Sequence, residues 1–159
     1  MITRAILLAA SAALLASCSV SSPQCTSVSL AQSGTLGDTI VLINGLRYIE
    51  TSVGTGTAAA WCQAASIQYD AFLTDGTLWD TSASNPTPFN LIPGMNQIAI
   101  HGLEQGIIGM KPGGQRRLII PSSLGYGNVL IRFNAANGTA TLIPPGSTLI
   151  YDVTLVTTQ

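Results

Sequence analysis

The chain has 159 residues, of which 47% are hydrophobic and only 8% are Asp, Glu, Lys or Arg. Its six bases and seven acids give a net charge of −1 at pH 7 and form no basic run, which argues against a nucleic-acid partner. This length has room for one domain, and the abundance of Ser, Thr, Asn, Gln and Gly suits an exported β protein.

The N-terminus has the pattern of a secretory signal. Arg4 supplies a positive start, and residues 5–16 are apolar except for Ser11, a run too short to span a bilayer. The following Leu15-Ala16-Ser17-Cys18 resembles the lipobox of bacterial lipoproteins. This resemblance implies diacylglyceryl transfer to Cys18, cleavage before it and acylation of the new N-terminus. The alternative is an ordinary signal peptide with a chance cysteine.

The lipobox divides the chain into a signal peptide at 1–17 that is removed, a lipidated N-terminus and tether at 18–42, and a domain at 43–159. Without Arg4, five bases face seven acids. Ser19 follows the lipidated position, and by the sorting rule of bacterial lipoproteins it favours the outer membrane. We therefore expect a lipid-anchored protein of the bacterial cell envelope, held at the outer membrane and facing the periplasm.

Cys25 and Cys62 are the two cysteines that remain. Export to an oxidising compartment favours a disulfide between them, which would tie the tether to the domain. A redox pair would be expected to show a C-x-x-C spacing, which is absent here. Two buried free thiols are the third interpretation.

Four segments have the apolar and β-branched content of strands. The first ends at Asn44-Gly45 and the third at Asp75-Gly76, which are strong turn signals, and Pro121 stops the fourth. In chain order the segments are residues 39–43, 46–51, 67–73 and 115–120.

One helix is predicted at residues 97–108, because Ile100, Leu103 and Ile107 recur at helical spacing and Gly109 follows. The chain then closes on an alternating strand. The Pro-Pro pair before it withholds two backbone donors, so pairing is expected only after Gly146. These elements predict an α+β fold that is mostly antiparallel sheet with one short helix. The side chains of the last strand that share one face are Leu149, Tyr151, Val153 and Leu155.

Six motifs occur in order between residues 43 and 159. They are Leu46-Arg47-Tyr48 with Gly54-Thr55-Gly56, Tyr69 with Asp75-Gly76-Thr77-Leu78-Trp79-Asp80-Thr81-Ser82, Pro88-Phe89, the segment 99–106, the segment 110–114 with Leu124-Gly125-Tyr126-Gly127, and Ile143-Pro144-Pro145 with the segment 149–153. Together they resemble the FKBP-type peptidyl-prolyl cis-trans isomerases.

The resemblance implies a curved antiparallel β-sheet, a half-barrel wrapped around one short α-helix, with an apolar cup between them. It implies that Tyr69, Asp80 and Tyr126 are catalytic, and that the Tyr126 hydroxyl and the Ile100 backbone N–H contact ligand carbonyls. The residues implied to bind substrate are Trp79, Phe89, Ala99, Ile100, Leu103, Ile143 and Tyr151.

The implied chemistry is rotation about an Xaa-Pro amide, whose barrier of ~18–20 kcal/mol comes from resonance. The twisted amide has lost that resonance and is less polar, so a dry aromatic cup favours it over the planar form. No nucleophile, metal or cofactor is required. The implied partners are proline-containing exported polypeptides and a rapamycin-like macrolide, and the protein is expected to be a monomer.

Other interpretations of these residues remain open. Tyr69, Phe89 and Tyr151 could be ordinary core aromatics, and Asp80 a solvated hairpin residue. His101, the single histidine, has no partners for zinc and is expected at the surface. The Arg116-Arg117 pair is expected on a solvated strand edge.

The chain departs from the family pattern in two respects. Leu103 replaces the tryptophan that commonly forms the floor of the cup, while Trp79 replaces a phenylalanine on its wall, so weaker macrolide binding is expected. Residues 128–142 form a longer loop, in which the run 129–133 before Asn137-Gly138 predicts a small hairpin. That hairpin is either a lid or docking element, or a family-variable loop.

Two functions follow from this resemblance. The first is isomerisation of Xaa-Pro bonds in exported proteins; the second is a binding or chaperone module on the same fold with little turnover.

Overall fold

The computed structural model describes residues 25, 27, 35–85, 87–134 and 140–159. The predicted signal peptide and lipidation site Cys18 lie outside these residues, as does the predicted Asn137-Gly138 turn.

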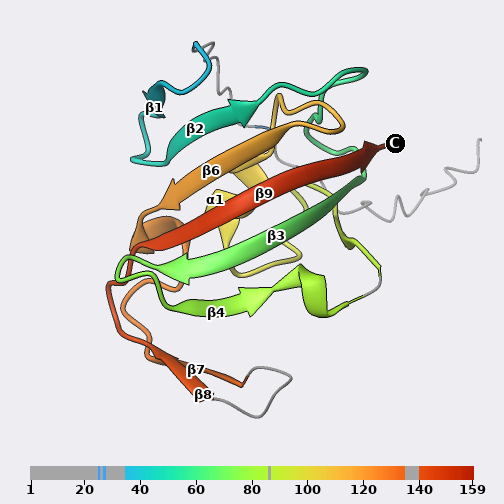
Figure 1. Ribbon diagram of the computed structural model, residues 1–159. Coiled ribbons are helices and arrows are strands. Elements are labelled where there is room, and N and C mark those ends of the chain that lie inside the picture. The colour runs from blue at the N-terminus through green and yellow to red at the C-terminus, as the bar shows by residue number, and fades with distance from the viewer. Residues whose placement is uncertain (1–24, 26, 28–34, 86, 135–139) are drawn as a thin grey trace, which may run out of the picture.

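Seven strands form one antiparallel sheet, and two more form a separate hairpin (Figure 1). The order in the large sheet is β1-β2-β6-β9-β3-β4, with β5 pairing beside β4 on the same edge of β3. The strands are β1 (Thr39–Val41), β2 (Arg47–Ser52), β3 (Ala65–Leu73), β4 (Leu78–Thr81), β5 (Phe89–Leu91), β6 (Gln115–Ile120), β7 (Ile131–Asn134), β8 (Ala140–Ile143) and β9 (Leu149–Thr158). The helices are α1 (His101–Gly106) and two 3-10 turns, η1 (Ser82–Ser84) and η2 (Ser122–Leu124).

The last strand, β9, lies at the centre of the sheet between β6 and β3 (Figure 1). Its burial alternates as predicted, because successive side chains of a strand point to opposite faces. The buried face packs toward α1, and the other face carries Asp152 beside Arg117 of β6. The predicted α+β architecture, a curved antiparallel sheet around one short helix, is confirmed.

Both predicted turns join strands. Gly45 and Gly76 have φ of 85° and 87°, which glycine adopts without the steric cost that a Cβ brings. The Asn44-Gly45 turn begins at Leu42, so β1 ends two residues earlier than predicted. β1 lies inside the segment 18–42 that was assigned to the tether, and it pairs with β2.

The helix is shorter than predicted. Gly94 and Asn96 both have positive φ, and Ile100 has φ −100° and ψ 82°, outside the helical region, so the chain becomes helical only at His101. The apolar residues at positions 100, 103 and 107 are buried all the same, because the turns on either side of α1 also pack on the sheet. Helical spacing therefore identified the buried face but not the helix ends.

Helix α1 approaches β6 unusually closely. A Cβ at Gly102 would overlap the side chain of Ile120, and one at Gly106 would overlap that of Leu118. These two glycines, one turn apart, let the backbone of α1 rest on the sheet and so set the depth of the space beside it.

Arg116 corrects one prediction. It was expected on a solvated edge, but β6 is an interior strand and the side chain is only 5% exposed. Its guanidinium donates to the carbonyl oxygens of Gly106 (2.7 Å) and Ile108 (3.0 Å) at the end of α1, and to Glu50 (3.0 Å). It also lies 4.2 Å from the ring centroid of Tyr48. Arg117, by contrast, is on the solvent face.

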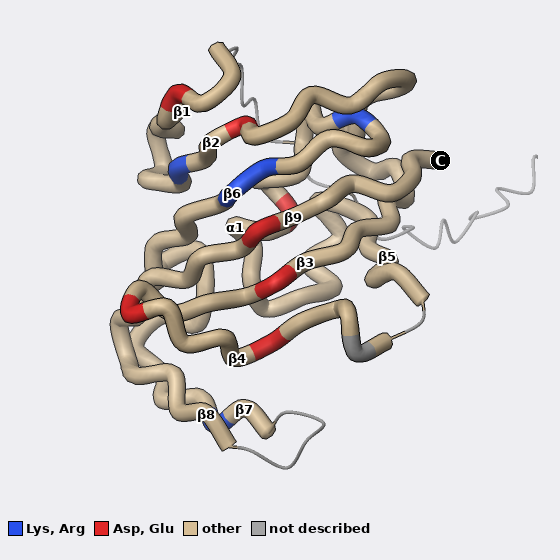
Figure 2. Tube along the Cα trace, in the orientation of Figure 1, with Lys and Arg blue, Asp and Glu red and all other residues tan. Residues whose placement is uncertain are grey.

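Charged residues are few and dispersed along the strands (Figure 2). No helix in the described part of the chain is long and apolar enough to cross a bilayer.

Candidate functional site

A cavity of about 200 Å³ opens on the concave side of the sheet, next to α1. Its walls come from four strands, the segment before α1, α1 itself and the segment after η2. The lining residues are Tyr69, Trp79, Asp80, Phe89, Ile98, Ala99, Ile100, Leu103, Tyr126 and Tyr151. The structure thus brings nine of the ten residues that the resemblance implied around one cavity, which we call the cup.

Ile143 is the exception. It is fully buried in β8, opposite Ile131 of β7, and is not among the residues that line the cup. The β7–β8 hairpin turns this side chain into the core behind the cup wall, and another hairpin residue, Phe133, packs on Trp79 instead.

Two residues near the cup were not singled out from the sequence. Ile98 lines it directly, and Phe133 supports Trp79 with ring centroids 5.2 Å apart. The alternation of the run 129–133 carried a signal for Phe133, because a hairpin there must turn one face inward. Nothing in the sequence showed which wall that face would meet.

Trp79 is the centre of the aromatic wall and is 2% exposed. Its ring makes edge-on contacts with those of Tyr126 and Tyr151, at centroid distances of 6.1 and 5.8 Å. Tyr69 adds an edge contact with Phe89 at 5.8 Å and a tilted one with Tyr151 at 5.4 Å. Such edge-to-face packing fixes ring orientation, so the cup is a rigid apolar surface.

Tyr69 and Asp80 form the polar element of the cup. The Tyr69 hydroxyl donates to Asp80 Oδ2 at 2.8 Å, and Asp80 Oδ1 accepts from the backbone N–H of Thr81 at 2.9 Å. Burial, followed by this hydrogen bond, raises the pKa of Tyr69 well above its ordinary value. The phenol therefore remains protonated, and the carboxylate is held in one orientation at the edge of the cup.

The backbone of Tyr69 is held by an unusual contact. Its N–H donates to Ser82 Oγ at 2.7 Å, and the same hydroxyl donates to the Tyr69 carbonyl at 3.2 Å. Strand β4 ends at Thr81, so Ser82 replaces the next ladder pair with a side chain. One hydroxyl thus fixes the residue that orients Asp80.

Three donors of the residues that line the cup have no acceptor among the described residues. They are the Tyr126 hydroxyl, the backbone N–H of Ile100, the cap residue of α1, and the buried indole N–H of Trp79. Burial, and then the charge of Asp80, raises the pKa of Tyr126, so this hydroxyl also stays protonated at neutral pH. Burial likewise raises the pKa of Tyr151. The cup can therefore bind an apolar ring and a carbonyl oxygen together.

The turn that leads into the rim of the cup is held by two hydrogen bonds from other parts of the chain. The turn before Ile98 is held by Glu104 Oε2, which accepts from the Gly94 N–H at 3.1 Å, and by the Cys62 N–H, which donates to the Pro93 carbonyl at 3.0 Å. Cys62 is joined to Cys25 by a disulfide with a Cα–Cα distance of 5.7 Å. The N-terminal segment is thus attached beside the turn that carries the rim.

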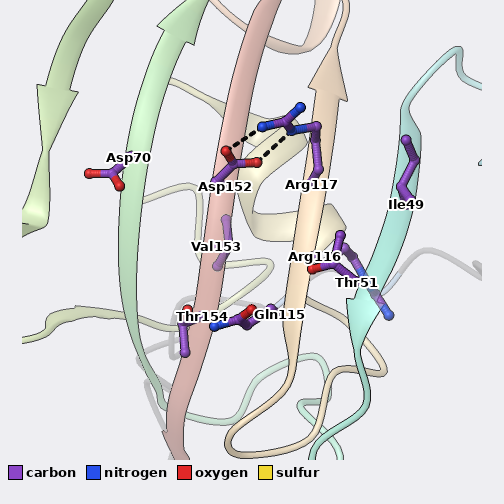
Figure 3. A pocket seen from close by; sticks show the side chains of 9 residues that line it. All are labelled: Ile49, Thr51, Asp70, Gln115, Arg116, Arg117, Asp152, Val153 and Thr154. Atoms are coloured by element: carbon purple, nitrogen blue, oxygen red, sulfur yellow. Dashed lines mark hydrogen bonds and ion pairs between the residues drawn. The ribbon is translucent and has the colours of Figure 1, made fainter. Parts of the chain in front are cut away.

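A larger hollow of about 420 Å³ lies on the opposite face of the sheet (Figure 3). It contains the exposed two-pronged pair of Arg117 with Asp152, at 2.6 and 2.7 Å. Its walls are polar and mostly solvated, and we do not take it as the functional site. Within the described ranges, no three His, Cys, Asp or Glu side chains lie close enough together to hold a metal ion.

A curved antiparallel sheet around one short helix, with an aromatic cup between them, is the architecture of FKBP-like proteins. The family model for FKBP-type peptidyl-prolyl cis-trans isomerases matches residues 56–156, and the chain belongs to this family.

Several known proteins are similar to the chain. A protein of Neisseria meningitidis serogroup B named "FK506-binding protein" is 35% identical over 72% of this chain and 96% of its own length. "FK506-binding protein 4" of Dictyostelium discoideum is 36% identical over 74% of this chain, which spans only 29% of that protein. Of the solved structures, AtFKBP13 matches with a TM-score of 0.65 and 28% identity, over 77% of this chain and 99% of its own. FkpA from Escherichia coli matches with a TM-score of 0.61 and 28% identity, over 76% of this chain and 51% of its own.

Proposed function

We propose that the protein is a peptidyl-prolyl cis-trans isomerase that acts on Xaa-Pro bonds of exported polypeptides. The observation that carries the proposal is the cup, where aromatic walls lie beside the Tyr126 hydroxyl and the Ile100 N–H, neither of which has an acceptor among the described residues, in a chain of the isomerase family. A proline ring fits the apolar walls, and the preceding carbonyl comes within reach of the Tyr126 hydroxyl or the Ile100 N–H.

Catalysis follows from what the cup offers to each form of the amide. The planar amide is polar and loses its hydration on entering, whereas the twisted amide has a smaller dipole and loses less. Asp80, fixed by Tyr69 and the Thr81 N–H, places its carboxylate oxygens in one orientation beside the rotating bond. The reaction forms and breaks no covalent bond.

The test is an isomerisation assay on short Xaa-Pro peptides. Tyr126→Phe removes one donor and should lower kcat/KM about fivefold, while Asp80→Leu removes a charged acceptor and should lower it at least tenfold. Tyr48→Phe is the matched control, because Tyr48 is a buried tyrosine of β2 beside Arg116, away from the cup. A wild-type rate no faster than the uncatalysed one would refute the proposal.

That outcome would favour the second function, a binding or chaperone module. The observation in its favour is the composition of the cup. Leu103 lies on the floor where the family pattern has a tryptophan, and Trp79 lies on the wall where the pattern has a phenylalanine. The same change is the reason to expect weak binding of a rapamycin-like macrolide.

The proposal includes a location. A lipid on Cys18 would hold the protein, as a monomer, at the outer membrane facing the periplasm, where newly exported chains fold. The support for this is the lipobox at 15–18 and the Cys25–Cys62 disulfide, a bond typical of oxidising compartments.

A further inference from the structure

A second cavity, of about 390 Å³, lies directly beside the cup. It shares three wall residues with the cup, namely Tyr69, Asp80 and Phe89. Its other walls are polar or small, unlike those of the cup. They are Thr81, Ser82, Asn85, Thr87, Pro88 and Asn90. We call this cavity the groove.

The groove exists because the edge of β3 is paired in two separate pieces. Residues 65–67 pair with β5 and residues 70–72 with β4, which leaves Gln68 and Tyr69 between the two strands. The chain between β4 and β5 leaves the sheet here through η1. The Ser82 hydroxyl bonds the backbone N–H and carbonyl of Tyr69, so no further strand can pair there, and the space between β4 and β5 remains as a cavity.

The chemistry of the groove suits a peptide backbone. Asn90 Oδ1 accepts from the Ser66 hydroxyl at 2.5 Å, and Asn85 Oδ1 accepts from the Thr87 hydroxyl at 3.4 Å. The amide nitrogens of both asparagines then have no acceptor among the residues that the structure describes. Donors of this kind, in a wall whose one charge is Asp80, fit the carbonyl groups of an extended chain.

The size of the cup supplies the second argument. We expect the cup, of about 200 Å³, to hold the proline ring while the residues on either side of it extend beyond the cup. Those residues must leave past the rim, and at Tyr69, Asp80 and Phe89 the rim is also the wall of the groove. The apolar cup and the polar groove therefore adjoin along these three residues.

We propose that the groove is an extended substrate subsite, which binds the polypeptide backbone next to the proline held in the cup. This inference rests on the proposed isomerase function. A subsite that recognises main-chain carbonyls would make the enzyme select substrates by chain length rather than by side-chain identity.

The test compares three peptides: a tetrapeptide with one central Xaa-Pro bond, and two heptapeptides that add three alanines to its N- or C-terminal end. With wild type, kcat/KM for one heptapeptide should exceed that for the tetrapeptide about fivefold, mainly through a lower KM, as expected of one net hydrogen bond. The favoured end identifies which side of the proline occupies the groove.

A matched pair of variants tests whether the heptapeptide advantage arises in the groove. Thr87→Trp places a large side chain at the exposed wall of the groove, and should reduce the heptapeptide advantage to near one. Thr55→Trp makes the same change at an exposed threonine in the loop after β2, across the sheet, and should retain the advantage.

Equal kcat/KM for all three peptides with wild type would overturn the groove while leaving the isomerase intact, as would an advantage that survives Thr87→Trp. If wild type isomerised none of them, the proposed function would fail instead. Calorimetric titration would then decide the groove: tighter binding of a heptapeptide that Thr87→Trp abolishes supports it, and equal dissociation constants refute it.

Discussion

At the scale of single residues, the cup depends on contacts that hold its polar pair in place. Asp80 is oriented by Tyr69, and the backbone of Tyr69 is held by Ser82, a residue that is 8% exposed and whose hydroxyl bonds both the N–H and the carbonyl of Tyr69. Ser82 lies in the wall of the groove, but its hydroxyl is already bonded to both backbone groups of Tyr69. It is a positioning residue that acts through Tyr69.

Ser82→Ala should therefore lower both stability and activity. It leaves the Tyr69 N–H without a partner, which costs about 2 kcal/mol, measurable by denaturant unfolding. Ser82→Thr retains the hydroxyl and should recover most of the loss. Ser147→Ala is the control, since the Ser147 hydroxyl bonds the Pro144 carbonyl at the surface and its loss should cost within about 0.5 kcal/mol.

Activity separates positioning from a general loss of stability. If Ser82 acts through Tyr69, then Ser82→Ala should reduce kcat/KM much less in a Tyr69→Phe background than in wild type, because coupled residues are not additive. Equal reductions in both backgrounds would show that Ser82 has no role in orienting Tyr69.

At the scale of elements, the cup depends on how α1 is held against the sheet. Gly102 and Gly106 bring the helix close, and Arg116 binds the carbonyl oxygens at its end while pairing with Glu50 of β2. The helix and the turn before it carry the floor and the rim of the cup. A buried arginine at the C-terminal end of the helix therefore supports the site although it does not line the cup.

Arg116→Met should lower the free energy of unfolding by about 3 kcal/mol, the low end for breaking a buried ion pair, because Glu50 is itself partly exposed. Arg117→Met is the matched control. The side chains of Arg117 and Asp152 are 49% and 38% exposed, so the loss of their ion pair should cost no more than about 1 kcal/mol. Similar losses for the two variants would contradict the role assigned to Arg116. Urea denaturation at neutral pH measures both.

The helices and strands also show which features could be predicted from the sequence. The alternation of β9 and the Gly45 and Gly76 turns were predicted, since period-two burial and positive φ are local properties. The helix ends, the burial of Arg116 and the contact of Phe133 with Trp79 were not, because they depend on which elements become neighbours. The cup residues came from family resemblance, which carries tertiary information that periodicity lacks.

At the scale of the whole molecule, the disulfide would set how far the domain lies from a membrane to which Cys18 is anchored. It closes a loop of 37 residues in sequence and should stabilise the fold by about 4 kcal/mol in the chain-entropy model. Seven peptide units separate Cys18 from Cys25. An extended chain spans at most about 3.5 Å per residue, so an acylated Cys18 would keep Cys25, the point of attachment to the domain, within roughly 25 Å of the bilayer surface.

The location proposal predicts that Cys18→Ala releases the protein from membranes in a fractionation of cells that express the full chain. Several acyl chains, at ~0.8 kcal/mol for each buried methylene, anchor far more firmly than one, and this variant has none. Cys25→Ala is the matched control: it removes the disulfide but leaves the lipobox intact, so it should remain in the membrane fraction even though its folded domain is less stable. Continued membrane association of Cys18→Ala would exclude Cys18 as the anchor, and release of both variants would assign attachment to the folded domain instead.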